Sequence, residues 1–162
     1  MDYNAEKLKA MILYISSHPV VTDIGLTKLY KIIYFADVTH LRETGESITG
    51  SDYIKYQHGP VPSRGERCLK RLRKEGQLHS ERQAYDNFEH IALTPLVDPP
   101  ANVLTAAQSD TLDQVCRELG PETASQLSDR SHQEPAWIAA SMQDKMPREL
   151  MYYGATEDLD GL

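Results

Sequence analysis

Three histidines stand at well-marked positions of the sequence, and histidine is the side chain best suited to acid–base or metal chemistry near neutral pH. His40 follows Asp37 by three residues, His58 precedes a Gly-Pro pair, and His132 lies two residues before Glu134. Residues three apart share one face of a helix, so Asp37 and His40 could form an acid–base pair. A hydrogen bond that orients a helix or a turn is the commoner meaning of such positions, and we favour structural roles for all three histidines.

The motifs that accompany such chemistry are missing from the sequence. His132-Gln133-Glu134 matches the H-x-E start of a zinc deaminase site, but the P-C-x-x-C element that completes it does not occur. No H-x-x-x-H pair, G-x-S-x-G element or glycine-rich phosphate loop is present. Cys68 and Cys116 form no C-x-x-C pair, and we expect them to be buried thiols. We therefore predict that the protein is not an enzyme and holds no metal or cofactor.

The elements that position these residues begin with two helices. Apolar residues recur at helical spacing over 4–17, where Asn4 is the expected N-cap. A longer helix is predicted over 26–44, capped by Asp23 or the threonine before it and ended by Gly45 in a left-handed conformation. Its apolar residues cover so much of its circumference that we expect it to be central, contacted from more than one side.

The sequence then changes character. A short strand is predicted over 53–57, where tyrosine and isoleucine favour extended backbone. Two prolines in Gly59-Pro60-Val61-Pro62 fix the φ angle and predict a rigid turn. A helix is predicted over 63–75, with Ser63 and Glu66 in a capping box.

The second half predicts one more hairpin and two more helices. The hairpin covers 77–93 with its turn at Tyr85-Asp86-Asn87, and the helices cover 105–119 and 122–130, with Gly120-Pro121 ending the first and starting the second. A helix followed by a two-stranded ribbon favours a winged-helix-like element. We therefore predict an α+β fold that is mostly α: a compact helical domain with a central long helix and a small β-hairpin.

Composition favours one soluble domain. The chain has 162 residues, of which 40% are apolar and 25% charged, as in ordinary globular proteins. No apolar run is long enough to span a bilayer, and the charged N-terminus lacks the apolar core of a signal peptide. We expect a cytoplasmic protein without a membrane partner, with a single domain over 1–150 and an acidic C-terminal tail over 151–162.

The net charge of −7 is unevenly distributed. Residues 1–54 carry 5 basic and 7 acidic side chains (−2), residues 55–82 carry 8 and 3 (+5), and residues 83–162 carry 4 and 14 (−10). The basic segment places a stripe on the helix predicted over 63–75, formed by Arg64, Arg67, Lys70, Arg71 and Lys74. Such a stripe can contact DNA phosphates, dock an acidic partner or simply face solvent.

Four tyrosines crowd the central helix and the segment after it. Tyrosine is enriched at protein interfaces, where its ring and hydroxyl are both used, although it also fills the edges of cores. We select as candidate partner-binding residues three of these tyrosines and three arginines of the basic stripe: Tyr30, Tyr53, Tyr56, Arg64, Arg67 and Arg71.

Two blocks of sequence resemble a known family. The first is K-L-Y-K-I-I-Y-F-A-D over 28–37, with His40-Leu41, Gly45, Ile48-Thr49-Gly50 and Tyr56-x-x-Gly59-Pro60-Val61 after it; the second is L-S-x-x-S-H-x-E-x-x-W over 127–137. Together they resemble the signature of the Panacea domain of SocA-like antitoxins, also labelled phage-associated proteins. The motif residues for which we expect structural roles are Tyr34, Phe35, Asp37, His40, Gly59, Pro60, Val61, His132 and Trp137.

The resemblance implies an antitoxin of a toxin–antitoxin pair, which neutralises a co-encoded protein toxin by direct binding or delivers it to a protease as an adaptor. A DNA-binding regulator that uses the helix over 63–75 is the alternative. Catalysis by Asp37, His40 and His132 is a third hypothesis, which requires these side chains to converge. We expect instead that His132 and Trp137 pack under the central helix, with His132 bonded to Asp37 or to a backbone carbonyl.

Overall fold

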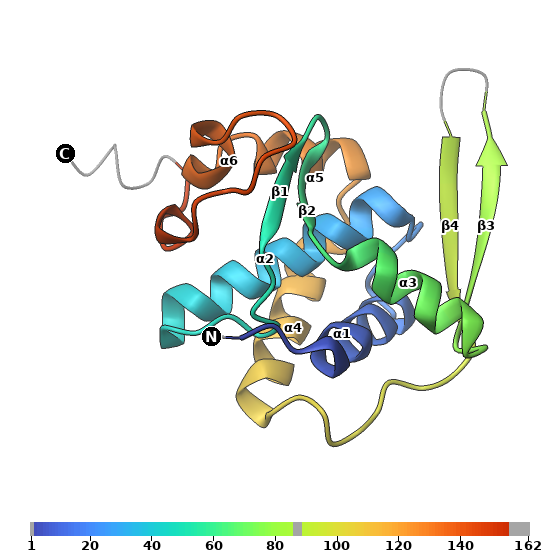
Figure 1. Ribbon diagram of the computed structural model, residues 1–162. Helices are drawn as coiled ribbons and strands as arrows, with labels where there is room; N and C mark the ends of the chain where they lie inside the picture. The colour runs from blue at the N-terminus through green and yellow to red at the C-terminus, as the bar shows by residue number, and fades with distance from the viewer. Residues whose placement is uncertain (1, 86–88, 156–162) are drawn as a thin grey trace.

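The computed structural model describes residues 2–85 and 89–155 and has the predicted α+β architecture, mostly helical around one long helix (Figure 1). In chain order the elements are α1 (Ala5–Ser17), α2 (Leu26–Thr44), β1 (Tyr53–Tyr56), β2 (Gly59–Pro62), α3 (Gly65–Lys74), β3 (Leu78–Ala84), β4 (Glu89–Pro95), α4 (Ala106–Leu119), α5 (Ala124–Ser131), α6 (Pro135–Ala139) and the 3₁₀ turn η1 (Arg148–Leu150).

Helix α2 is the centre of the fold, as predicted. Helices α1, α4 and α5 and strand β2 pack around it, and it is buried continuously from Lys28 to Val38. It ends at Gly45, whose φ of 89° is the left-handed conformation that glycine adopts easily, and the Gly45 N–H donates to the Leu41 carbonyl. The expected N-cap was wrong: Gly25 caps α2 without a side-chain bond, because it forms a β-bridge with Ala92 and the helix begins only after that bridge.

The segment expected to be a rigid turn is strand β2. It pairs antiparallel with β1, from Tyr53 opposite Pro62 to Tyr56 opposite Gly59, and the turn lies at Gln57-His58. Proline donates no backbone hydrogen bond, but it is tolerated in β2 because this strand lies at a sheet edge. The other side of β1 is lined by the segment before η1, where the Met146 N–H donates to the Tyr53 carbonyl at 2.8 Å.

Two helices begin later than predicted. The capping box of Ser63 does not form, because the Ser63 N–H donates to the Asp52 carbonyl and continues the pairing of the hairpin. Helix α3 therefore begins at Gly65. Helix α5 begins after Thr123, which forms a capping box with Gln126, and not at Pro121.

The second hairpin projects from the body beside α3 (Figure 1). Strands β3 and β4 pair from Leu78 opposite Pro95 to Ala84 opposite Glu89, close to the predicted bounds; the expected turn lies partly outside the described residues. Leu78 and Leu93 of the hairpin are buried in the core and Ile91 packs against it, while Leu93 and Ala92 pair with Ile24 and Gly25 along the edge of β4.

The C-terminal boundary differs from the expectation. Met151, assigned to the tail, is 3% exposed, and the η-nitrogen of Arg42 donates to the Tyr153 carbonyl at 2.8 Å. Residues 151–155 therefore pack on the domain, and the rest of the expected tail lies outside the described residues.

Candidate functional site

Five polar side chains leave α2 at three-residue intervals, although the helix is buried. They are Lys28, Lys31, Tyr34, Asp37 and His40. Three residues are about 60° short of a full turn of an α-helix. Each side chain of this series is therefore rotated by about 60° from the one before it, and successive members point in different directions. Each one bonds to a different segment, and together they attach the rest of the chain to α2.

Asp37 organises the loop that leads into β1. Its carboxylate is fully buried and accepts hydrogen bonds from the Ile48 N–H and the Thr49 N–H, both at 2.9 Å. The Thr49 hydroxyl (2.6 Å) and the Tyr53 hydroxyl (2.5 Å) donate to its other oxygen. Burial raises the pKa of Asp37, while these donors act in the opposite direction. A site saturated by four donors has no free oxygen for catalysis.

Tyr34 connects α2 to the second motif block. Its hydroxyl donates to Glu134 at 3.1 Å, and Arg42 donates to the same carboxylate oxygen at 2.8 Å. The other Glu134 oxygen accepts from the Ala155 N–H at 3.1 Å, while Arg42 also binds the Met151 carbonyl. Burial and the Glu134 charge raise the pKa of Tyr34, so it remains a neutral donor. This cluster holds α6 and the C-terminal segment on α2.

Lys28 binds the C-terminal end of α4, and His40 binds its middle. The Lys28 ammonium donates to the Gly120 carbonyl at 2.6 Å and also to the Thr22 carbonyl. His40 Nδ1 lies 3.0 Å from the Thr111 hydroxyl. Sequence reasoning selected His40 but missed both lysines of the series; the signal that could have identified them is the three-residue repeat of polar residues on an otherwise apolar helix.

The tip of the β1–β2 hairpin is held by side chains of both motif blocks. Four neighbouring carbonyls, at 56, 57, 58 and 60, each accept one side-chain donor: Trp137 Nε1 (3.1 Å), His132 Nε2 (2.9 Å), Ser128 Oγ (2.5 Å) and Lys31 Nζ (2.6 Å), respectively. We call these four donors the hairpin clamp. Its members come from α2 (Lys31), α5 (Ser128), the C-cap of α5 (His132) and α6 (Trp137), so the clamp joins elements that are distant in sequence.

Lys31 is the most deeply buried member of the clamp. It is 1% exposed, and burial lowers its pKa to about 7. A side chain at Gly59 would collide with Ser131 Oγ and with the Lys31 stem, and Gly59 has a φ of 120° that favours glycine. The Gly-Pro of the motif thus leaves room for the lysine that binds the Pro60 carbonyl.

His132 and Trp137 do not pack under α2 as expected, because their hydrogen bonds go to the hairpin. Their rings stack with centroids 4.3 Å apart, and the Lys55 ammonium lies 3.9 Å from the centre of the Trp137 ring. Of the two partners expected for His132, the backbone carbonyl is confirmed, and it belongs to Gln57.

Beside the clamp lies an exposed apolar area that we call the hairpin–α6 surface, formed by Tyr56, Trp137, Ile138 and Met142. Tyr56, Ile138 and Met142 are 43%, 59% and 52% exposed, and Trp137 is half-buried. The Trp137 indole is bonded to Tyr56, and the Gln143 N–H donates to the Lys55 carbonyl at 2.7 Å, which brings Met142 to the same edge of β1.

The candidate partner-binding residues divide into two groups. Tyr53 is fully buried and Tyr30 is 7% exposed, so neither offers the exposed ring that we expected. Both fill the core, because the Tyr53 hydroxyl binds Asp37 and the Tyr30 ring packs over Gly65. Those that retain exposed surface are Tyr56, Arg64, Arg67 and Arg71. Of the remaining motif residues, Phe35 is buried against Tyr34 and Val61 is half-buried in β2.

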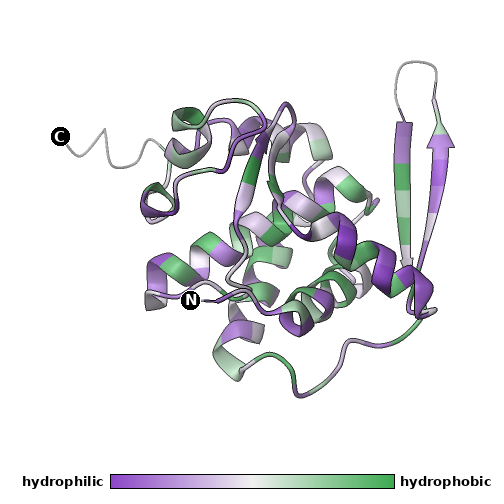
Figure 2. Cartoon of the chain, viewed as in Figure 1, coloured by the Kyte–Doolittle hydropathy of each residue, from purple (hydrophilic) through white to green (hydrophobic). Residues whose placement is uncertain are grey.

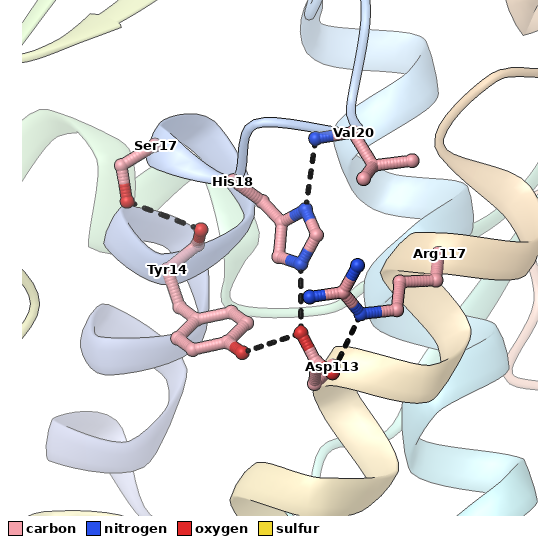
Figure 3. A network of polar contacts seen from close by, with 6 residues as sticks. All are labelled: Tyr14, Ser17, His18, Val20, Asp113 and Arg117. Atoms are coloured by element: carbon pink, nitrogen blue, oxygen red, sulfur yellow. Dashed lines mark hydrogen bonds and ion pairs between the residues drawn. The ribbon is translucent and has the colours of Figure 1, made fainter.

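A second histidine cluster joins α1 to α4 (Figure 3). The Val20 N–H donates to His18 Nδ1 at 3.1 Å, so Nε2 carries the proton that faces Asp113 at 2.8 Å. Tyr14 and Arg117 donate to the same carboxylate at 3.2 and 2.9 Å. These donors lower the pKa of Asp113 to about 2. The cluster resembles part of a catalytic triad, but every member is bonded to another, which fits a structural role.

Asp37, His40 and His132 do not form a common site. Each is bonded to a different segment, at residues 48–53, at Thr111 and at Gln57. Burial raises the pKa of both cysteine thiols to about 12, so neither is an activated nucleophile. Within residues 2–85 and 89–155, no three histidine, cysteine or acidic side chains come together in a way that could hold a metal ion.

The clamp residues from Lys31 to Trp137 lie within the range that a known protein-family model matches. The family model described as "Antitoxin SocA-like, Panacea domain" matches residues 29–138, about two thirds of the chain. The chain therefore belongs to this family of antitoxin-like proteins. No curated protein matches the sequence. Among the described helices, none is both long and apolar enough to cross a membrane.

Proposed function

We propose that the protein is an antitoxin that neutralises a co-encoded protein toxin by binding it through the hairpin–α6 surface. The observation that carries the proposal is the pairing of this exposed apolar area with the hairpin clamp. The family membership supports a protein partner, and we propose that the protein acts on it in the cytoplasm.

The physical argument is preorganisation. Binding through mobile side chains costs conformational entropy, and a surface held rigid before binding avoids part of that cost. The clamp fixes the backbone beside Tyr56, while the indole of Trp137 is held by its hydrogen bond, its stack on His132 and the Lys55 cation. Aromatic and large apolar residues on a fixed frame are typical of the residues that dominate binding energy at interfaces.

The test is co-expression with the product of the adjacent gene. We expect wild-type protein to restore growth and the double variant Ile138→Asp/Met142→Asp to lose that ability, because two charges would be buried at the contact. Both side chains are more than half exposed, so the melting temperature should stay within a few degrees of wild type.

The matched control is Leu96→Asp/Val97→Asp. These residues are 56% and 42% exposed and lie in the linker after β4, away from the hairpin–α6 surface. The control should neutralise as wild type does. Full neutralisation by the Ile138/Met142 variant would place the contact elsewhere, and an adjacent product that is harmless alone would remove the antitoxin proposal itself.

Sequestration and delivery to a protease make different predictions for the partner's lifetime. If the complex alone inhibits, the toxin persists at its normal half-life in the presence of the antitoxin. If the antitoxin is an adaptor, the toxin half-life shortens, and it lengthens again when the protease is removed. A pulse-chase measurement in both backgrounds separates the two forms of the proposal.

A further inference from the structure

Helix α3 presents a basic face that the proposed neutralising function does not use. Its apolar side chains, Cys68, Leu69 and Leu72, are buried against the body. Figure 2 shows α3 as largely hydrophilic, in contrast with α2. The N-cap Arg64 and five basic residues of α3 are exposed: Arg67, Lys70, Arg71, Arg73 and Lys74.

Only part of this charge is neutralised within the molecule. Lys70 lies 3.5 Å from Glu66 and Arg71 lies 3.0 Å from Glu75, but both are surface pairs of the weak i,i+4 kind. Within the described part of the chain, Arg67 and Lys74 form no ion pair. The face therefore keeps a positive charge that faces solvent.

The elements around α3 have the order of a winged helix. The Leu93 N–H donates to the Ile24 carbonyl, and Gly25 forms an antiparallel bridge with Ala92, so the segment between α1 and α2 runs along the outer edge of β4. Chain order is then α1, this short edge segment, α2, α3, β3 and β4, with the β1–β2 hairpin inserted before α3. In this arrangement α3 corresponds to the helix that helix-turn-helix proteins place in the major groove.

The exposed side chains of the α3 face favour a polyanion over a protein as the binding partner. Protein interfaces have apolar or aromatic anchors at their centre and are depleted in lysine. The exposed face of α3 has no such anchor, since the large exposed hydrophobic residues among the described ones lie in other elements. Arginine and lysine without apolar anchors are what phosphate contacts require.

We propose that the α3 face binds duplex DNA, with α3 in the major groove and the arginines and lysines on phosphates. A ten-residue helix is about 15 Å long, and a helix with its side chains is about as wide as the groove. The net charge of −7 opposes this binding at long range, but salt screens repulsion from the distant acidic half more than it screens direct contacts.

The test is fluorescence anisotropy with a labelled 24-base-pair duplex of mixed sequence across a salt series. About four phosphate contacts predict a slope of about −4 in a plot of log K against log salt concentration. Arg67→Glu/Lys74→Glu should lower the affinity at least tenfold and make the slope shallower by about 2. Circular dichroism melts show whether the variant is folded.

The matched control is Arg130→Glu/Lys145→Glu, which changes the net charge by the same amount. Both side chains are more than half exposed, and neither belongs to α3. This control should bind DNA nearly as wild type does. An absence of salt-dependent binding at about 50 mM salt, or equal losses in both double variants, would overturn the proposal and leave the neutralisation proposal untouched.

Discussion

The two β-hairpins of the fold share a topology but differ in how they are held. The β1–β2 hairpin has four-residue strands, and four carbonyls around its turn are bonded to the hairpin clamp. The β3–β4 hairpin has seven-residue strands; Leu78 and Leu93 are buried in the core, and the edge of β4 pairs with Ile24 and Gly25. The shorter hairpin is held at its turn by side-chain donors, whereas the longer one is held through Leu78 and through the backbone edge and apolar residues of β4.

The difference indicates which positions the family motif specifies. Donors of the clamp come from both motif blocks, so the motif describes a structure that holds one hairpin in one geometry. Among the described residues, β3–β4 is attached through the backbone edge of β4 and a few apolar side chains, and the charged side chains of β3 face solvent. We therefore expect substitutions near β1–β2 to lower stability strongly, and matched substitutions near β3–β4 to have little effect.

The largest expected effect is at Asp37. Asp37→Ala leaves two backbone N–H groups and two hydroxyls without their acceptor in a fully buried site, and should cost about 4 kcal/mol of unfolding free energy. Glu81→Ala on exposed β3 should stay within about 0.5 kcal/mol of wild type. Urea denaturation measures both, and similar costs for the two variants would contradict the comparison.

Glycines near the two hairpins give a second contrast. Gly59→Ala should cost about 3 kcal/mol, because the new methyl group collides with Ser131 and Lys31 at a φ of 120°. Gly76, just before β3, has a φ of 71°, and a methyl group at this position would meet no other atom within 4 Å. Gly76→Ala should therefore cost about 1 kcal/mol, from backbone conformation alone. If Gly59→Ala lowered the unfolding free energy no more than Gly76→Ala, the packing around Lys31 would have to adapt freely to the new methyl group.

The sequence predicted most of the helices and little of the clamp. The bounds of α2 and the Asn4 cap follow from local signals, namely apolar periodicity, the Gly45 stop and an asparagine before the first turn. The strand at 59–62 was missed, because two prolines argue against a strand unless it lies at an edge, which depends on tertiary pairing. Asp37, His132 and Trp137 were selected as motif residues, but their partners are 11 to 81 positions away. Contacts between residues so far apart in the chain produce no periodic pattern in the local sequence, so the sequence alone does not indicate them.

Lys31 makes stability depend on pH. Its pKa is about 7 in the folded protein and near the ordinary 10.5 in the unfolded chain, so the unfolded chain binds more protons between these values. The contribution of Lys31 to the unfolding free energy therefore rises with pH, by about 2 kcal/mol from pH 7 to pH 9. Lys31→Met lacks this contribution. We expect the difference in unfolding free energy between wild type and variant, measured by denaturation at pH 7 and pH 9, to change by that amount. The same difference at both pH values would show that the ammonium is solvated in the folded protein.

The smallest expected effect tests the exposed end of the clamp. Trp137→Ala removes a half-buried ring, its stack on His132, the Lys55 contact and the hydrogen bond to the Tyr56 carbonyl. Full burial of tryptophan is worth about 3 to 5 kcal/mol, so a half-buried ring should cost about 1.5 kcal/mol. Tyr85→Ala, at the end of β3, removes a ring that is 53% exposed and should cost about 0.5 kcal/mol or less.

In co-expression, Trp137→Ala should also weaken neutralisation while Tyr85→Ala does not. A loss of stability without a loss of neutralisation would assign Trp137 to holding the hairpin alone, and would move the proposed contact toward Ile138 and Met142.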